Sequence, residues 1–326
     1  MLKAAFINDG FPLIKEEHII NLVFGLGRRE KLAGMVDLHP EIITTDSLEA
    51  HRDVLMDVDV VFSTWGFPEL SESQLDLMPN LKVVFYAAGA TSSFREPLLK
   101  RGIRISSATS ANAIPVAEYA LSHMLMAGAG FYRNSRECTD PVHASAGNSY
   151  RGHGNYAKRV AILGNGTISK LLQDFLSHHE IEVIEVASRE AKRTISLEEA
   201  FSTSYAIVNL FPDVEDNGGV YDRALFSSMI DGAVFINCGR GRQVNEADLI
   251  SVFKERPDLT AILDVQWPEP PVAGSELYTL PNVYLSSHLA GSKAAELVRM
   301  GDYMLTEFEH FQRDEPMQYE VLWNQL

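Results

Sequence analysis

Four ionisable residues lie at or just after the ends of apolar segments whose composition is typical of β-strands. Arg240, Asp264 and His288 each come at the end of such a segment, and Glu269 lies between two prolines after Asp264. The carboxyl ends of strands in an open parallel sheet are where ligands bind, so we expect these side chains at one edge. A histidine exchanges protons near neutral pH, a nearby carboxylate favours its charged form, and a guanidinium holds carboxylates through paired hydrogen bonds. The set therefore predicts proton transfer on a bound anionic molecule.

Each residue alone also has a simpler interpretation. Arg240 could be a salt-bridged surface residue with glycines that only form a turn, and Asp264 could only cap the turn that follows it. Glu269 could be an exposed turn acid, and His288 could be a packing residue. Because they follow one another at successive strand ends, we favour a shared site.

Residues 160–176 predict a strand, a tight turn and a helix. Gly164 permits the turn, and Gly166 lets a ligand's phosphates approach the amides at the helix N-terminus. Ser169 stands where the G-x-G-x-x-G pattern has its third glycine. A dinucleotide site and a turn without a ligand both remain open from this stretch alone.

Composition limits the classes of partner. The 326 residues include 28 Lys and Arg against 44 Asp and Glu, a net charge of −16, which disfavours nucleic acids and membrane surfaces. An anionic substrate then needs a local positive group, which Arg240 supplies. Cys138 and Cys238 have no metal-ligand spacing, so no metal site is predicted. Two cysteines, an N-terminus that reaches Asp9 before any signal segment, and no bilayer-length apolar run together predict a cytoplasmic protein.

Short apolar runs alternate with helical patterns and predict two α/β units with parallel sheets. In the first unit we expect strands over 3–7, 58–63, 81–86 and 103–106, and helices over 16–32 and 71–77. A long helix begins near Asn112 with Pro115 in its first turn, and a loop covers 139–155. In the second unit we expect strands over 160–163, 181–186, 205–210, 233–236, 260–264 and 283–286, and helices over 170–176 and 244–253. A final helix over 293–311 could return to the first unit.

Several motifs in register resemble the D-isomer-specific 2-hydroxyacid dehydrogenases over nearly the whole chain. They are Asn112-Ala113 with Val116-Ala117-Glu118, Gly164-x-Gly166-x-Ile168, Asn237 through Gly241, Asp264-Val265 with Glu269-Pro270, and His288-Leu289-Ala290-Gly291. The resemblance implies two Rossmann-like doubly wound parallel-sheet domains with an active-site cleft between them. Residues 1–108 plus 293–326 would bind substrate and residues 109–292 the dinucleotide. It also implies a homodimer built on the nucleotide domain.

The resemblance also implies roles for individual residues. Arg240 would hold the substrate, His288 would be the acid/base, and Glu269 would orient and charge His288. Asp264 would hydrogen-bond the nicotinamide carboxamide, and the amides of Ala88, Gly89 and Ala90 would hold the substrate carboxylate. Trp65 could line the pocket or simply pack in the core. The residues expected to contact the cofactor are Gly164, Gly166, Thr167, Ile168, Ser188, Arg189, Cys238, Gly239 and Asp264.

The cofactor is expected to be NADP or NAD, with NADP favoured. Ala187 stands where NAD-preferring relatives carry an aspartate for the ribose hydroxyls. Ser188, Arg189, Lys192 and Arg193 follow it and could pair with a 2′-phosphate, although they could also be a solvated loop face.

The expected activity is hydride transfer between NAD(P)H and a small anionic 2-oxo acid or D-2-hydroxy acid, as in a glyoxylate/hydroxypyruvate reductase. One alternative is a dinucleotide-sensing binding protein similar to corepressors of this fold, and Arg240, Glu269 and His288 count against it. Another is a formate-dehydrogenase-like enzyme, which Glu269 disfavours because those relatives pair the histidine with glutamine. The individual 2-oxo acid is not readable, because loops of both domains shape the pocket.

Overall fold

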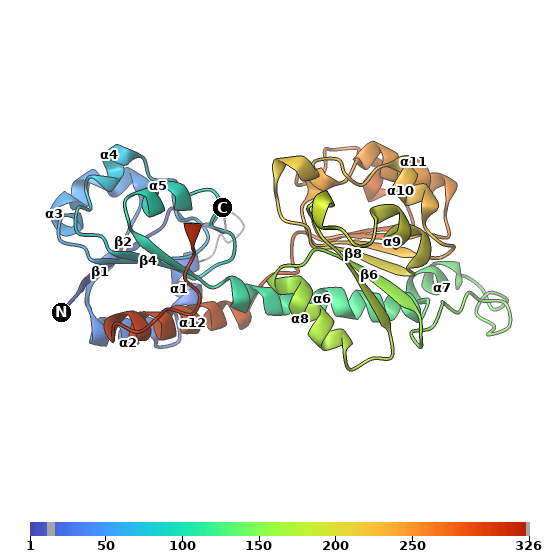
Figure 1. The fold of residues 1–326 in the computed structure, drawn as a ribbon, viewed down its shortest axis with the longest axis horizontal. Coiled ribbons are helices and arrows are strands. Elements are labelled where there is room, and N and C mark those ends of the chain that lie inside the picture. The colour runs from blue at the N-terminus through green and yellow to red at the C-terminus, as the bar shows by residue number, and fades with distance from the viewer. Residues whose placement is uncertain (12–16, 324–326) are drawn as a thin grey trace. The chain divides into compact units, whose positions relative to one another are not determined.

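The computed structural model describes residues 1–11 and 17–323 (Figure 1). Contacts divide the chain into two compact units, Met1–Asn112 with Ser292–Leu326 and Ala113–Gly291. Each unit holds one sheet in which all neighbouring strands are parallel. The predicted α/β class with two parallel-sheet domains is confirmed.

The first unit has a five-stranded sheet covered by helices on both faces. Its strand order is β2 (Asp37–Ile43), β1 (Lys3–Ile7), β3 (Val60–Ser63), β4 (Val83–Tyr86) and β5 (Arg104–Ser107). One face packs against α1 (Ile19–Val23), α2 (Arg28–Met35) and α12 (Glu296–Gln312). The other packs against α3 (Arg52–Leu55), α4 (Glu72–Leu75) and α5 (Arg95–Lys100), and the 3-10 turns η1 (Thr45–Ser47) and η2 (Glu49–His51) precede α3. Burial on both faces explains why most of these strands are apolar runs.

Two features of this unit differ from the sequence-based predictions. Strand β2 was not predicted, because Pro40 and three polar residues interrupt its apolar ones and only Ile43 is buried, a composition tolerated at a sheet edge. The helix predicted over 16–32 is instead the pair α1 and α2, and its first residue, Glu16, lies outside the described residues. Gly27, in the left-handed conformation at φ 85°, directly precedes α2 and prevents one continuous helix.

A buried carboxylate fixes the C-terminal segment to this unit. Helix α12 lies beside α1 and α2 (Figure 1) and carries Glu307, whose side chain is fully buried. Glu307 accepts hydrogen bonds from Ser106 Oγ and from the backbone amides of Gln318 and Tyr319, at 2.8 to 3.0 Å. These bonds connect α12, β5 and the end of the chain.

The second unit has a six-stranded sheet. Its strand order is β11 (Val283–Leu285), β10 (Thr260–Leu263), β9 (Val234–Asn237), β8 (Ala206–Asn209), β6 (Arg159–Leu163) and β7 (Glu182–Val186). One face packs against α9 (Leu197–Thr203), α10 (Arg223–Ser228) and α11 (Glu246–Glu255), and the other against α6 (Thr109–Gly128) and α8 (Thr167–Leu176) (Figure 1). Shorter elements are α7 (Phe131–Glu137), η3 (Glu190–Lys192), η4 (Glu215–Asn217), η5 (Gly241–Gln243) and η6 (Glu276–Tyr278). The chain reverses direction across the sheet between β6 and β8, which is where such folds bind ligands.

Helix α6 begins earlier than predicted. It starts at Thr109, so Pro115 lies inside the helix and not in its first turn. The amide of Asn112 already donates to the carbonyl of Ala108, which shows that the helical bonding begins before the proline. Residues 139–155 form turns without a helix or strand, as predicted. Among the described residues, no helix combines the length and apolar character needed to cross a bilayer.

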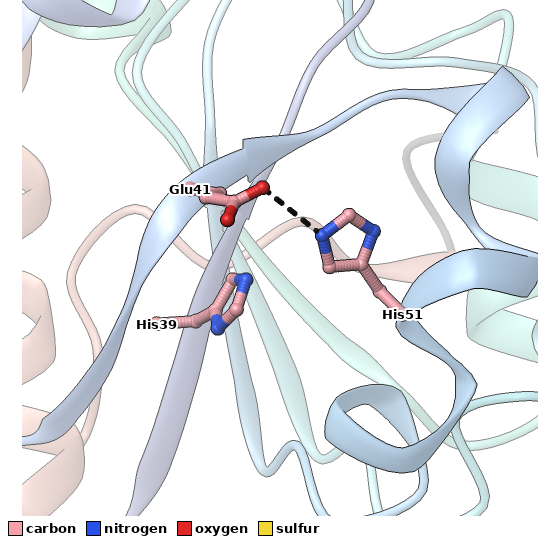
Figure 2. Close-up of side chains that lie close together, drawn as sticks. All are labelled: His39, Glu41 and His51. Atoms are coloured by element: carbon pink, nitrogen blue, oxygen red, sulfur yellow. Dashed lines mark hydrogen bonds and ion pairs between the residues drawn. The ribbon is translucent and has the colours of Figure 1, made fainter.

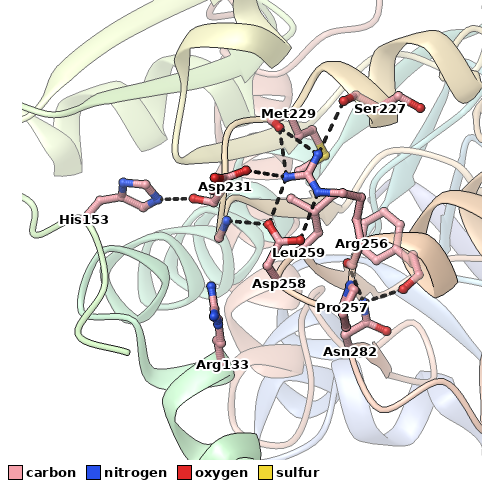
Figure 3. Close-up of polar contacts among 12 residues, drawn as sticks. Arg133, His153, Ser227, Met229, Asp231, Arg256, Pro257, Asp258, Leu259 and Asn282 are labelled. Carbon is pink, nitrogen blue, oxygen red and sulfur yellow. Dashed lines mark hydrogen bonds and ion pairs between the residues drawn. The ribbon is translucent and has the colours of Figure 1, made fainter. Parts of the chain in front are cut away.

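Arg256 holds two loops of the second unit together (Figure 3). Its guanidinium donates two hydrogen bonds of 2.9 Å to the carboxylate of Asp258 and one of 3.0 Å to Asp231. The Asp258 carboxylate also accepts from the amide of Gly232 at 2.9 Å, and His153 Nε2 lies 2.8 Å from the carbonyl of Asp231. The cluster fixes the turn before β9 against the end of α11.

Candidate functional site

His288 and Glu269 form a hydrogen-bonded pair after the last two strands of the second sheet. His288 Nδ1 lies 2.8 Å from Glu269 Oε1, and the two side chains are 45% and 37% exposed. Since a carboxylate only accepts hydrogen bonds, Nδ1 carries the proton in this contact and Nε2 remains for another partner. The pair therefore has the geometry of an imidazole oriented by an acid.

Asp264 fixes the backbone around His288. Its own carbonyl accepts from the amide of His288 at 2.9 Å. Its carboxylate accepts from the amides of Leu289 and Ala290, at 2.8 and 3.1 Å. His288 adopts φ 55°, a conformation that is rare for residues other than glycine and that persists only when the surroundings enforce it. The Asp264 contacts supply that enforcement.

A chain of hydroxyl groups supports Asp264 from α6. Ser286 Oγ donates to Asp264 Oδ1 at 2.7 Å and lies 3.0 Å from the hydroxyl of Tyr119. Burial raises the pKa of Tyr119 to about 12, so its hydroxyl stays protonated at neutral pH. With three bonds to its carboxylate in place, Asp264 keeps one acceptor position on Oδ2 for a ligand amide.

Arg240 is positioned separately from this pair. Its Nη1 donates to the carbonyl of Gly239 at 2.8 Å, and its Nε lies 3.8 Å from Asp213 Oδ2. Among the described residues, no polar contact joins Arg240 to Glu269 or His288, and its side chain is 41% exposed. The residue after Arg240 is Gly241, and the backbone of Gln266 packs directly against it. A Cβ on Gly241 would lie 1.9 Å from the carbonyl group of Gln266, so only glycine fits there.

A buried amide network lies beneath the Arg240 turn. Asn209 Nδ2 donates to Asn237 Oδ1 at 2.8 Å and to Gln243 Oε1 at 2.7 Å, while Tyr221 donates to Asn209 Oδ1 at 2.7 Å. Asn237 Oδ1 and Gln243 Oε1 then accept from the amides of Gly239 and Arg240, at 3.1 and 3.0 Å. Sequence reasoning named none of these side chains as positioning groups. The available signal was an asparagine as the last residue of two neighbouring strands, where Asn209 and Asn237 are register partners.

The glycine turn has room for a pyrophosphate. Gly164 has φ 131°, and a Cβ there would lie 2.8 Å from the carbonyl oxygen of Leu210, so only glycine fits. Nothing lies within 4 Å of a Cβ placed on Gly166, which is the residue before α8. The first amides of α8, at Thr167 and Ile168, have no acceptor inside the helix. A helix N-terminus with open space above it fits a phosphate group.

Ser169 occupies the third glycine position without a hydrogen bond. Its side chain is 1% exposed, and its Oγ has no partner among the described residues. A Cβ on Gly164 would approach that oxygen to 3.0 Å, so the two residues pack directly together. The serine is therefore accommodated between helix and strand, with its hydroxyl unpaired.

Cys238 and the loop after β7 are the other residues expected to contact the cofactor. Burial, reinforced by the negative charge of Asp264, raises the pKa of the Cys238 thiol, so the thiol stays neutral. Arg193 donates to the carbonyls of Ala187 and Ser188, at 3.1 and 3.2 Å, which places its guanidinium at the end of β7. Arg189 is exposed two residues after Ala187, so both arginines follow β7 within seven positions.

The first unit positions the predicted substrate amides. The carbonyl of Gly89 accepts from Ser107 Oγ and Thr109 Oγ1, at 2.8 and 2.9 Å, and Ser107 Oγ also lies 3.0 Å from the carbonyl of Ala88. The prediction that all three amides are available is wrong for Ala88, because its amide already donates to the carbonyl of Tyr86 at 2.8 Å. Across residues 1–11 and 17–323, the amides of Gly89 and Ala90 have no acceptor. The hydroxyl groups hold the backbone in place through its carbonyls, so the amides of Gly89 and Ala90 remain available to donate to an anion.

Trp65 lies after β3, at the point where the first sheet changes direction. Asn8 Nδ2 donates to its carbonyl at 2.9 Å, and its ring stacks on Phe11 at 5.7 Å between centroids. The ring also packs against both hydrophobic clusters of the unit. Core packing therefore accounts for part of its role.

Comparison with known proteins identifies the chain's relatives. Residues 121–290 match the family described as D-isomer specific 2-hydroxyacid dehydrogenase, NAD binding domain. The Bacillus subtilis protein YoaD, whose name assigns it to the 2-hydroxyacid dehydrogenases, is 28% identical over 239 residues, which cover 69% of this chain and 68% of that protein. Glyoxylate/hydroxypyruvate reductase A of Citrobacter koseri is 32% identical over 116 residues, 35% of this chain and 36% of the reductase. The crystal structure of apo D-mandelate dehydrogenase from Rhodotorula graminis has the same fold, with a TM-score of 0.77, 19% identity, and coverage of 98% and 97%.

Proposed function

Since the chain belongs to the D-isomer specific 2-hydroxyacid dehydrogenase family, we propose that it transfers a hydride between NAD(P)H and a small 2-oxo acid, giving the D-2-hydroxy acid. The observation that carries the proposal is the His288–Glu269 pair on a backbone held by Asp264. Reduction of a ketone needs both a hydride and a proton, and this pair is built to hold the proton.

His288 acts as the acid in reduction and the base in oxidation. With Nδ1 bonded to Glu269, the Nε2 proton of the imidazolium is the one available to the substrate carbonyl oxygen. The negative charge of Glu269 stabilises the imidazolium before transfer and fixes the ring orientation. After transfer the neutral ring must regain a proton from solvent, which the half-exposed side chain permits.

Arg240 and the amides of Gly89 and Ala90 bind the substrate carboxylate in this proposal. The guanidinium contact with Asp213 is long at 3.8 Å, so an incoming carboxylate can replace it at low cost. The amide network under Gly239 keeps the arginine turn in place while the side chain changes partner.

The glycine turn holds the dinucleotide pyrophosphate over α8. The open space at Gly166 and the free first-turn amides of that helix support this assignment. Asp264 Oδ2 offers its remaining acceptor position to the carboxamide. When bound, the nicotinamide supplies or accepts the hydride.

NADPH is the preferred cofactor in this proposal. No acid follows β7 at Ala187, and Arg189 and Arg193 bring positive charge to the place where a 2′-phosphate would lie. Changing Ala187 to aspartate should lower kcat/KM for NADPH and raise it for NADH. Equal or better use of NADH by the wild type would reject the preference.

A small substrate of the glyoxylate or hydroxypyruvate type is proposed on the partial similarity to the reductase. The experiment is a panel of 2-oxo acids, from glyoxylate to bulkier acids, assayed with NADPH and NADH for the wild type and for Arg240→Lys. We expect turnover of at least one small acid and a raised KM for it in Arg240→Lys, since lysine cannot reproduce the paired hydrogen bonds. Turnover of none would reject the enzyme assignment.

A cytoplasmic homodimer is also part of the proposal. The presence of only two cysteines supports a reducing compartment. The net charge of −16 disfavours anionic surfaces as partners. Sedimentation equilibrium of the purified chain tests the dimer, and a monomer at micromolar concentration would reject it.

A further inference from the structure

Three metal-ligating side chains meet at the edge of the first sheet, in residues 1–112 (Figure 2). His39 and Glu41 are two positions apart on the edge strand β2, in the part of it where the register with β1 shifts. His51 comes from η2, which follows β2 along the chain. One nitrogen of each imidazole and one carboxylate oxygen lie within 4.8 Å of one another.

His51 presents one ring nitrogen to Glu41. Its Nδ1 lies 2.9 Å from the carbonyl oxygen of Ser47, and since a carbonyl only accepts, Nδ1 carries a proton. Its Nε2 lies 3.4 Å from Glu41 Oε2. Either a second proton or a cation must lie between these two atoms to make the contact favourable. A backbone carbonyl on the opposite nitrogen is the usual way in which a protein orients a metal-binding histidine.

His39 supplies an independent observation. Its Nε2 is buried and has no hydrogen-bond partner among the described residues. The two imidazole rings face each other edge to face, with centroids 5.3 Å apart, so two potential donors converge without a bond between them. A buried polar atom left unpaired destabilises the fold unless something binds it.

A surface pocket borders His39, one of the three residues of the cluster. It has a volume of about 320 Å³ and is lined by His39 together with Asp37, Asp53 and Asp57 and by one lysine, Lys3. With three acidic residues and one lysine in its lining, this pocket attracts cations. An ion could therefore reach His39 from solvent.

We propose that His39, Glu41 and His51 bind one divalent transition-metal ion of the zinc class. Two imidazoles and one carboxylate are a donor set that Zn²⁺ accepts, with bonds of about 2.0–2.2 Å. At a tetrahedral angle such bonds separate neighbouring donor atoms by about 3.3 Å, close to the 3.4 Å between Glu41 Oε2 and His51 Nε2. Water fills the fourth position. The bound ion connects β2 to the turn that contains η2 and stabilises this edge of the sheet.

This proposal departs from the sequence-based prediction of no metal site. That prediction searched for familiar histidine and cysteine spacings, whereas here a His-x-Glu pair on a strand meets a histidine ten positions after Glu41. The site is independent of the proposed dehydrogenase activity, which uses no metal.

Calorimetric titration of ZnCl2 into the metal-free, untagged full chain tests the site. We expect one Zn²⁺ per chain for the wild type, and at least a tenfold loss of affinity in His39→Gln and in His51→Ala. Glu41→Gln preserves shape and should also weaken binding, with circular dichroism verifying its fold. Zn²⁺ should raise the melting temperature of the wild type but not of these variants.

His143→Ala is the matched control, because His143 also pairs with a carboxylate, that of Asp140 at 2.6 Å, without a second histidine. His288→Ala tests the His288–Glu269 pair in the same way. Both should bind Zn²⁺ like the wild type. No binding by the wild type, unchanged binding in the His39 and His51 variants, or an equal loss in either control would overturn the proposal.

Discussion

Glu269 Oε1 lies 2.8 Å from Nδ1 of His288, and both side chains remain open to solvent. Glu269→Gln keeps a hydrogen-bond acceptor beside the histidine but removes the negative charge that stabilises an imidazolium. Since the proposed proton donor is the imidazolium, we expect kcat for 2-oxo acid reduction to fall at least about tenfold.

The control for this change is Glu276→Gln, which removes an exposed surface acid paired with Lys254. Its kcat should follow the wild type. A wild-type kcat in Glu269→Gln would contradict a role of the carboxylate charge in proton transfer.

The two cysteines should differ in reactivity. Burial raises the pKa of Cys238, so little of it is the reactive thiolate, whereas Cys138 is exposed. Iodoacetamide at pH 7.5 should modify Cys138 rapidly and Cys238 only after unfolding, as followed by peptide mass spectrometry. Labelling of both residues at similar rates in the folded protein would show that the site around Cys238 is open.

The Arg256 cluster predicts a pH-dependent part of the stability. Burial tends to raise the pKa of Asp258, but its hydrogen bonds with Arg256 and the Gly232 amide outweigh this, so the pKa lies below its ordinary value of 3.8. Such a carboxylate contributes stability above about pH 4, and this is lost as pH falls through the folded-state pKa. In urea denaturation, Asp258→Asn should cost about 1–2 kcal/mol at pH 7 and progressively less below pH 4.

Asp57→Asn is the comparison for that measurement, because Asp57 forms an exposed pair with Lys3. It should change the free energy of unfolding by well under 1 kcal/mol. A cost for Asp258→Asn that is the same at pH 7 and pH 3 would mean that its charge does not contribute.

The unpaired hydroxyl of Ser169 predicts that one substitution raises the stability of the protein. Its buried hydroxyl has no partner, so Ser169→Ala removes an unsatisfied group without changing the Cβ packing against Gly164. The free energy of unfolding should rise by up to about 1 kcal/mol. Ser169→Gly, which restores the glycine pattern, should instead lower stability by about 0.5–1 kcal/mol because glycine weakens a helix. A destabilised Ser169→Ala would show that the hydroxyl has a partner in solution.

The sequence predicted the elements whose own residues carry the signal. Apolar runs such as Val160–Leu163 predict strands because both faces of a parallel sheet are buried, and the glycines at 164 and 166 predict the turn. Strand β2 was missed because an edge strand needs no apolar run. The break between α1 and α2 was missed because glycines inside a helical pattern were not treated as a stop.

The contacts that hold the site depend on residues far apart in sequence, and no local pattern indicates them. Asn209 meets Gln243, 34 positions later, and Glu307 binds amides of the last segment, contacts that exist only after the sheets form. The His39 cluster is of the same kind, since a strand and a short turn bring it together. In contrast, the glycine and histidine motifs are short enough to be read directly.

The most direct test of the central claim is to separate binding from chemistry in His288→Asn. The account predicts that this variant binds NADPH as the wild type does, as measured by fluorescence titration, while kcat for the best 2-oxo acid falls by about 10² or more, because the proton donor is gone. A variant that binds NADPH normally and reduces the acid at the wild-type rate would contradict the account.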